Sequence, residues 1–96
     1  MKVLAIDYGD ARTGVAISDA MGWLTGHTEV IASRNPEKTA QTLAELIRKH
    51  GVERVVMGYP KNMDGSEGPR AELYRAFAAR LEAASGLPVV LWDERR

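Results

Sequence analysis

The sequence predicts a mixed α/β domain in which one five-stranded sheet has the element order βββαβαβ. The first observation is a set of short β-branched runs bounded by Gly and Asp, which are typical of strands. The second is a pair of segments with apolar residues at helical spacing, each followed by a glycine. The third is that each of the last two strands follows a helix, which favours parallel pairing through right-handed crossovers.

The first three strands are expected to form an antiparallel meander. Residues 3–6 are a short apolar run that stops at Asp7, and residues 15–17 are a second run that stops at Ser18. A tight turn joins these two runs, and a third strand follows around residues 28–32. Short connections between successive strands favour antiparallel neighbours.

The turn between the first two strands is the first candidate for a functional site. Asp7 stands at the open end of a strand, close to Gly9, and Gly14 follows the turn. Glycine lets a backbone come close to its neighbour, so a metal ion or a phosphate could be held there. The alternative is that Asp7 only ends the strand and bonds its own turn, as Asp often does.

Two helices are predicted with clear end signals. Asn35 suits the N-cap and is followed by proline, so the first helix runs over residues 36–50 and stops at Gly51. The second runs over about residues 69–85 and stops at Gly86. The apolar stripe expected on the second helix comprises Leu73, Phe77, Leu81 and Ala84, with Tyr74 and Ala78 beside it.

The last two strands are short, and polar residues follow each of them. Residues 53–58 form the fourth predicted strand, and the loop of residues 59–68 holds turn formers and few apolar groups. Residues 89–92 form the fifth, which ends on the charged segment 93–96. Ligands of open sheets with crossovers bind beyond the carboxyl ends of the strands, so both polar segments are expected beside the Asp7 turn.

The composition is that of one small globular domain, covering residues 1–96, with no charge-driven choice of partner. The charges of its 13 basic and 13 acidic side chains cancel, whereas nucleic-acid-binding domains are typically basic. The absence of cysteine excludes disulfides and thiolate metal sites. No signal peptide and no apolar run near the ~20 residues that span a bilayer are present, so we expect a cytoplasmic chain without a membrane partner.

Two acids at strand ends form a candidate metal site. If the first and last strands are neighbours, Asp7 and Glu94 can share Mg²⁺ or Mn²⁺, which prefer oxygen ligands. Adjacent strand residues point to opposite faces, so only one of Asp93 and Glu94 can face the metal, and we select Glu94. The alternative is that this end of the chain is simply a solvated charged segment.

A basic rim is expected around this acidic centre. Lys and Arg contacts with phosphate position a nucleic acid without reading its sequence, and Arg binds phosphate through its bidentate fork. The candidate substrate-binding residues are Arg12, Lys61, Asn62, Arg70 and Arg95, with Tyr8 and Tyr59 beside the site. The alternative for each is a solvated surface residue. Turn roles are expected for Asp10, Asp19 and Asp64, and structural roles for His27 and His50. Core positions are expected for Trp23, Tyr74, Phe77 and Trp92.

Three segments together resemble the motifs of the YqgF-like proteins. Residues 3–16 match the opening motif of this family, which is described as Holliday-junction-resolvase-like and as nucleases that mature the 5′ end of 16S ribosomal RNA. Residues 58–66 resemble its second motif, Gly-x-Pro-x-x-x-x-Gly, and residues 92–95 resemble the start of the third, Asp-Glu-Arg-Leu-Thr-Thr. The motifs follow the family's order and spacing, and the resemblance covers essentially the whole chain.

The resemblance implies a ribonuclease H-like fold and a metal-dependent nuclease, with Asp7 and Glu94 as metal-binding catalytic acids and Gly9 and Gly14 as turn residues. Family members continue into a helix that carries a further acid, whereas here Arg96 stands where the motif has Leu. That final helix is therefore expected to be missing, and the apolar strip it would leave favours a homodimer.

Several functions remain open at the level of sequence. The first is hydrolysis of structured nucleic acid with Mg²⁺ or Mn²⁺, either an RNA precursor or, as in a Holliday-junction resolvase, branched DNA. A second is nucleic-acid binding without turnover, because a further acid is lacking. A third is the phosphate-binding half of an actin-like ATPase or sugar kinase, which also opens with a strand, an Asp-x-Gly turn and a hairpin but needs two large lobes.

Overall fold

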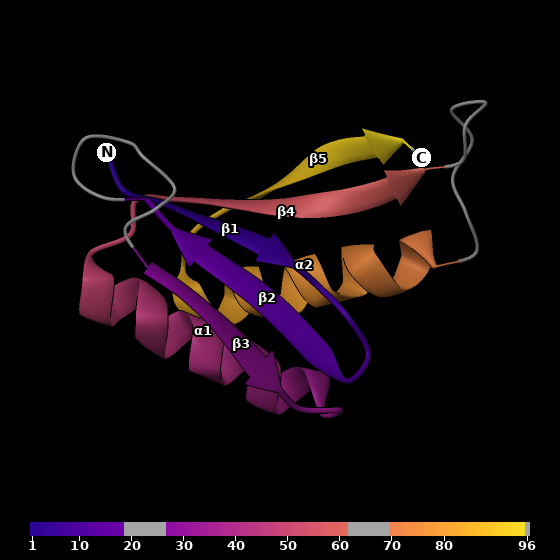
Figure 1. Ribbon diagram of the computed structural model, residues 1–96, viewed down its shortest axis with the longest axis horizontal. Helices are drawn as coiled ribbons and strands as arrows, with labels where there is room; N and C mark the ends of the chain where they lie inside the picture. The colour runs from indigo at the N-terminus through magenta and orange to yellow at the C-terminus, as the bar shows by residue number, and fades with distance from the viewer. Residues whose placement is uncertain (19–26, 62–69, 96) are drawn as a thin grey trace.

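The computed structural model describes residues 1–18, 27–61 and 70–95 of the 96-residue chain. The elements follow the predicted order (Figure 1). They are β1 (Val3–Asp7), β2 (Arg12–Ile17), β3 (His27–Ala32), α1 (Pro36–His50), β4 (Arg54–Lys61), α2 (Ala71–Ser85) and β5 (Val89–Arg95). The predictions made for Asp19, Trp23, Asn62 and Asp64 lie outside the described residues.

The strands form one mixed sheet in the order β3-β2-β1-β4-β5. β1 pairs antiparallel with β2, and β2 with β3, which confirms the predicted meander. β4 pairs parallel with β1 on one side and with β5 on the other, which confirms the parallel pairing expected of strands that follow helices. The carboxyl ends of β1, β4 and β5 therefore lie at the same edge of the sheet.

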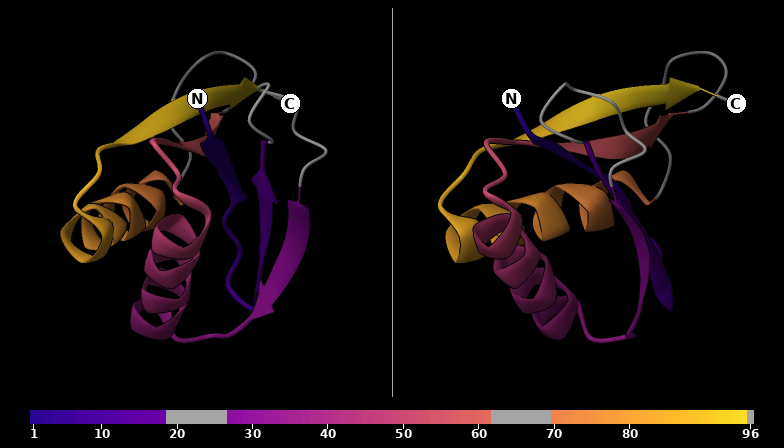
Figure 2. Two further views of the ribbon diagram at one scale, coloured as in Figure 1. Left: turned by 90° about the vertical axis from the view of Figure 1, so that its left-hand side faces the viewer. Right: turned by 60° about the vertical axis from the view of Figure 1, so that its left-hand side comes forward.

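Both helices cover one face of the sheet, and no described helix lies on the other (Figure 2). The core fills the space between the helices and the sheet and includes Leu4, Ile6, Val15, Ile17, Leu43, Ile47, Val55, Met57, Phe77 and Leu81. Successive strand residues point to opposite faces, so the alternate residues form a second, open face. On this open face Val30, Val90 and Trp92 are 65%, 48% and 63% exposed.

Helix α1 has the predicted ends. The Asn35 side chain accepts hydrogen bonds from the backbone N–H groups of Glu37 and Lys38 at 3.0 and 3.3 Å, and Pro36 occupies the first turn. Gly51 ends the helix with a φ of 67°, a left-handed conformation that favours glycine. Among the described residues, neither helix is long and apolar enough to cross a membrane.

Two strands run further than their sequence predicts. β4 continues past Gly58 to Lys61, although Pro60 favours a loop, and β5 continues past Trp92 to Arg95. The two extensions pair with each other, from Gly58 with Trp92 to Lys61 with Arg95. The β1 ladder ends before this level, so β4 has one neighbour there, and proline is tolerated in a strand with a free side.

Two residues expected in the core are exposed. Leu73 is 52% exposed because the buried side of α2 is formed by Ala71, Phe77, Ala78 and Leu81. Trp92 is 63% exposed because it alternates with Leu91, which packs against the core, and so faces the open side. Phe77 is buried and Tyr74 packs against the core, as expected.

We expect the free energy of unfolding to fall as the pH drops below 6.5, because of His50. Desolvation, followed by the charge of His27 at a ring separation of 5.0 Å and of Lys2 and Lys49, lowers the pKa of His50 from 6.5, and Glu29 opposes this shift. The unfolded chain then binds more protons below that pH, so acid favours unfolding. Thermal unfolding of the wild type and His50→Gln between about pH 7.5 and about pH 5.5 measures this effect. An equal decline in both proteins would contradict the assignment.

Candidate functional site

The candidate site lies where β1, β4 and β5 end. Asp7 is the last residue of β1, and the ladder that precedes it aligns Ile6 with Met57 and Met57 with Leu91. Asp7 is exposed and comes one residue after that row, on the open side of the sheet. A carboxylate at this position can reach a ligand that approaches the strand ends, as ligands do in open sheets with crossovers.

A shallow groove of about 250 Å³ runs over the open face beside Asp7. It is lined by Ala5, Ile6, Asp7, Gly14, Val15, Ala16, Val56, Gly58 and Trp92. Most of these side chains are small, and the two glycines lie in strands on either side of Asp7. A Cβ at Gly14 would stand 3.7 Å from the Asp7 Cβ, so glycine keeps the surroundings of the carboxylate open.

Trp92 is a residue of this groove, and its predicted position in the core is wrong. Its exposed ring lines the groove together with Asp7, rather than filling the core. Trp92 lies two positions after Val90 and therefore shares its exposed face. Residues 89–92 are all apolar, so the sequence pattern does not indicate which of them face the core.

The turn after β1 is compact because of a glycine. A Cβ at Gly9 would lie 2.3 Å from the backbone oxygen of Arg12, a distance that no side chain could accept without a shift of the backbone. The backbone of the turn therefore comes close to itself at Gly9, as predicted from the glycine in the sequence. Arg12 is exposed at the start of β2, next to this turn.

Tyr8 anchors the same turn to α2. Its ring stacks on Phe77 with centroids 4.0 Å apart and meets the ring of Tyr74 edge-on at 5.6 Å. The Tyr74 hydroxyl donates a hydrogen bond of 2.9 Å to the backbone oxygen of Tyr8. Burial, followed by the charge of Asp10, raises the pKa of the Tyr8 phenol, so this residue stays neutral.

Arg70 and Asp10 form an ion pair across the site edge. The Arg70 guanidinium donates to the Asp10 carboxylate at 2.6 Å, and both side chains are exposed. This hydrogen bond lowers the pKa of Asp10 below its ordinary value of 3.8. A guanidinium has five N–H donors, so Arg70 keeps others for a further acceptor.

The structure separates Asp7 from Glu94 by one strand. Glu94 pairs with Pro60 of β4, and β4 lies between β1 and β5, so the condition that the two acids stand on neighbouring strands is not met. The two backbones are about two strand spacings apart, roughly 10 Å. The side chains of Lys61, Glu94 and Arg95 lie outside the described part of the structure.

Among the described residues, no group of three or more His, Asp or Glu side chains could hold a metal ion. Asp7 is the described carboxylate that lines the groove. Its oxygens are hard donors of the kind that Mg²⁺ and Mn²⁺ prefer, and these ions often use only one or two protein carboxylates together with water and phosphate. The donor type of Asp7 therefore fits such an ion.

The sheet order, the parallel crossovers and the two helices on one face define a ribonuclease H-like domain. The solved structure of Thermus thermophilus RuvC resembles it with a TM-score of 0.67 and 18% identity, over 97% of this chain and 64% of that one. The ROK hexokinase of Thermus thermophilus also resembles it, with a TM-score of 0.57 and 25% identity over 97% of this chain and 35% of the enzyme.

The chain belongs to the RuvX family, whose model carries the description Holliday junction resolvase and matches residues 1–96. This confirms the resemblance drawn from the three motifs. A protein of Pelotomaculum thermopropionicum named "Putative pre-16S rRNA nuclease" is 50% identical over 96 residues. The match covers 99% of this chain but only 62% of that relative, so the chain spans less than two thirds of its length.

Proposed function

We propose that this domain hydrolyses phosphodiester bonds in structured RNA, and that its substrate is the 5′ end of the 16S ribosomal RNA precursor. The observation that carries the proposal is an exposed carboxylate, Asp7, in an open groove at the carboxyl ends of three strands. Membership of the RuvX family supports a nuclease, and the name of the Pelotomaculum relative supports this choice of substrate.

Although β4 separates their strands, Asp7 and Glu94 would both hold Mg²⁺ or Mn²⁺ at this edge, because such sites can use more than one ion and the two carboxylates need not touch the same one. Such an ion, when bound, lowers the pKa of water and stabilises the charge that builds on phosphate. The glycines at positions 14 and 58 keep the groove shallow beside Asp7, so a phosphodiester backbone can approach the carboxylate without meeting a side chain. Asp7 would position the reacting phosphate only through the ion that it holds, because two bare anions repel each other, and Glu94 would supply the second carboxylate from the end of β5.

Further substrate contacts are proposed for basic and polar residues outside the groove lining. Phosphate groups would be bound by Arg12, Lys61, Asn62, Arg70 and Arg95. The exposed Trp92 ring gives a flat surface next to Asp7, and aromatic rings bind unstacked bases with little dependence on sequence. Single-stranded RNA next to a helical segment would satisfy both kinds of contact.

A cleavage assay in Mn²⁺ tests the proposed function. It compares an RNA that carries the 5′ end of the 16S precursor with a four-way DNA junction, using this chain and a version extended at its C-terminus to the length of the Pelotomaculum relative. Cleavage of the RNA alone is the expected result. Cleavage of the junction alone would favour the resolvase alternative, and binding without cleavage by either protein would favour a non-catalytic module.

The resolvase alternative rests on the description of the family model. The binding-module alternative rests on the single carboxylate that the described groove contains. An ATPase or sugar-kinase fragment is a weaker alternative. The ROK hexokinase shares this fold over only 35% of its chain, so most of that enzyme has no counterpart here.

We further propose that the open face of the sheet binds a second copy of this chain when no RNA is bound. Trp92 also lines the groove beside Asp7, so self-association and substrate binding would compete for this face. Val30, Val90 and Trp92 expose apolar surface on one face, and a net charge of zero gives two copies no long-range repulsion. Two such faces can stack at the usual distance of about 10 Å between sheets.

Val30→Lys is therefore expected to shift sedimentation from dimer toward monomer, whereas Ala76→Lys is expected to leave it unchanged. Val30 is exposed on the open face of the sheet, and Ala76 is exposed on α2, which covers the other face. The second substitution thus controls for the added charge. A wild type that stays monomeric across the micromolar range would contradict self-association.

A further inference from the structure

The first half of α2 contacts the turn that follows Asp7, here called the Asp7 turn. Arg70 immediately precedes α2, and Tyr74 and Phe77 follow it at intervals that place all three on one side of the helix. Arg70 forms an ion pair with Asp10. The Tyr74 hydroxyl donates a hydrogen bond to the backbone oxygen of Tyr8, and Phe77 stacks on the Tyr8 ring. The turn is thus fixed at its backbone, at one ring and at one carboxylate.

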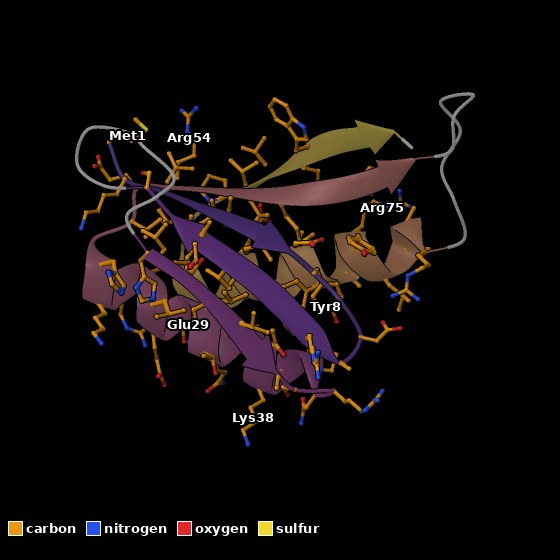
Figure 3. All side chains as sticks on the ribbon, in the orientation of Figure 1. Met1, Tyr8, Glu29, Lys38, Arg54 and Arg75 are labelled. Atoms are coloured by element: carbon orange, nitrogen blue, oxygen red, sulfur yellow. The ribbon has the colours of Figure 1, made fainter. Side chains whose placement is uncertain are left out.

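The same part of α2 also contacts the end of β4. The Arg75 guanidinium donates a hydrogen bond to the Tyr59 hydroxyl and lies 6.0 Å from the centre of that ring. Tyr59 is 4% exposed and follows Gly58, which lines the groove. Figure 3 shows Tyr8 and Arg75 toward the end of the molecule where β1 and β4 finish.

We propose that this part of α2 is a positioning platform, formed by Arg70, Tyr74, Arg75 and Phe77, that fixes the Asp7 turn relative to the end of β4. The inference rests on the proposed function, in which Asp7 is a metal ligand. Tyr8 follows Asp7 directly, so the hydrogen bond from Tyr74 restricts the peptide that leaves the carboxylate-bearing residue. Functional groups need a geometry fixed within about 0.5 Å, which neighbouring contacts of this kind provide.

A positioning role and a purely electrostatic role of Arg70 predict opposite changes in metal affinity when Arg70 is replaced. Its positive charge lies at the edge of the Asp7 site, so losing that charge alone would strengthen the binding of a cation by electrostatics. Losing the contact with Asp10 loosens the turn and weakens binding. The direction of the change in affinity therefore separates a positioning role from a purely electrostatic one.

The test measures Mn²⁺ affinity by titration calorimetry without substrate, in Tyr74→Phe and Arg70→Gln. Tyr74→Phe removes only the hydroxyl, which bonds the Tyr8 backbone oxygen and also interacts with Arg70. The loss of a hydrogen bond of this kind is expected to weaken binding by about threefold to tenfold. Arg70→Gln is expected to weaken it similarly. Unchanged affinity in Tyr74→Phe, or tighter binding in Arg70→Gln, would overturn the proposal.

Arg80→Gln is the matched control. Arg80 also lies on α2 and pairs with an exposed carboxylate, that of Glu37 on α1, away from the groove. The side chains of Arg70 and Arg80 are 46% and 47% exposed, so both substitutions break a pair of similar exposure. Equal weakening of Mn²⁺ binding in the two variants would indicate a general loss of stability and would also overturn the proposal.

A second measurement is independent of metal binding. Backbone order parameters of residues 8–11, measured by NMR without metal, are expected to fall from about 0.85 toward about 0.6 in Tyr74→Phe and to stay unchanged in Arg80→Gln. If the wild type binds no Mn²⁺, the proposed metal site is wrong, and these order parameters alone decide whether the platform exists. If they are equal in the wild type and Tyr74→Phe, the platform is wrong even when Mn²⁺ binds.

Discussion

Replacing Phe77 by alanine is expected to destabilise the domain by about 3–5 kcal/mol, the usual cost of removing a buried aromatic ring. Phe77 is 2% exposed, belongs to the core between α2 and the sheet, and stacks on Tyr8. A chain of 96 residues has a free energy of unfolding of about 5–14 kcal/mol. The loss would therefore be a large fraction of the total and would lower the melting temperature by more than about 10 °C.

Leu73→Ala is the matched control for that substitution. Leu73 lies on the same helix and is also a large apolar residue, but it is 52% exposed. Its replacement is expected to change the free energy of unfolding by no more than about 0.5 kcal/mol. Urea unfolding followed by circular dichroism measures both variants. A similar loss in the two would mean that the buried face of α2 is assigned wrongly.

The contrast between Phe77 and Leu73 shows which parts of the fold the sequence can predict. Helix α1 was predicted with the bounds that the structure has, because Asn35, Pro36 and Gly51 are local signals that need no tertiary contact. The face of α2 was predicted less well. Leu73 and Phe77 both fit one apolar stripe at helical spacing. Which of the two is buried depends on the side of α2 that packs against the sheet, and the helix sequence alone does not indicate that side.

The lengths of β4 and β5 were underestimated for a related reason. Pro60 and the charged residues after Trp92 favour loops when each segment is taken alone. The two segments stabilise each other as strands by pairing, and the side of β4 that β1 leaves free tolerates a proline. The two segments are far apart in the sequence, so the pattern of neither segment alone predicts that they pair.

The candidate site was predicted in the same uneven way. Asp7 could be proposed from its position at a strand end, but its relation to Glu94 could not, because strand order depends on the whole sheet. The structure inserts β4 between the two strands, and it adds Trp92 as a groove residue. The contacts of Arg70 with Asp10 and of Tyr74 with Tyr8 join residues 60 and 66 positions apart, and no spacing rule indicates them.

Replacing Asp7 by asparagine is expected to lower metal-dependent cleavage by more than about 100-fold. Residues that merely orient a metal ligand cost 10–100-fold when mutated, so loss of a ligand that touches the ion should cost more. Asparagine has the same shape and Asp7 is exposed, so the free energy of unfolding should change by less than about 0.5 kcal/mol. Mn²⁺ titration gives a second readout that does not require cleavage, and it should show weaker binding in the variant.

Glu53→Gln is the control for the loss of one carboxylate. Glu53 is exposed just before β4, at the opposite end of the sheet from Asp7, so its replacement should leave both cleavage and Mn²⁺ binding unchanged. Wild-type cleavage and affinity in Asp7→Asn would show that the groove carboxylate does not serve the reaction. The expected result is that only Asp7→Asn loses cleavage and Mn²⁺ binding while its free energy of unfolding stays unchanged. Asp7→Asn and Glu53→Gln each remove one negative charge, so this result would assign the chemistry to the carboxylate at the end of β1.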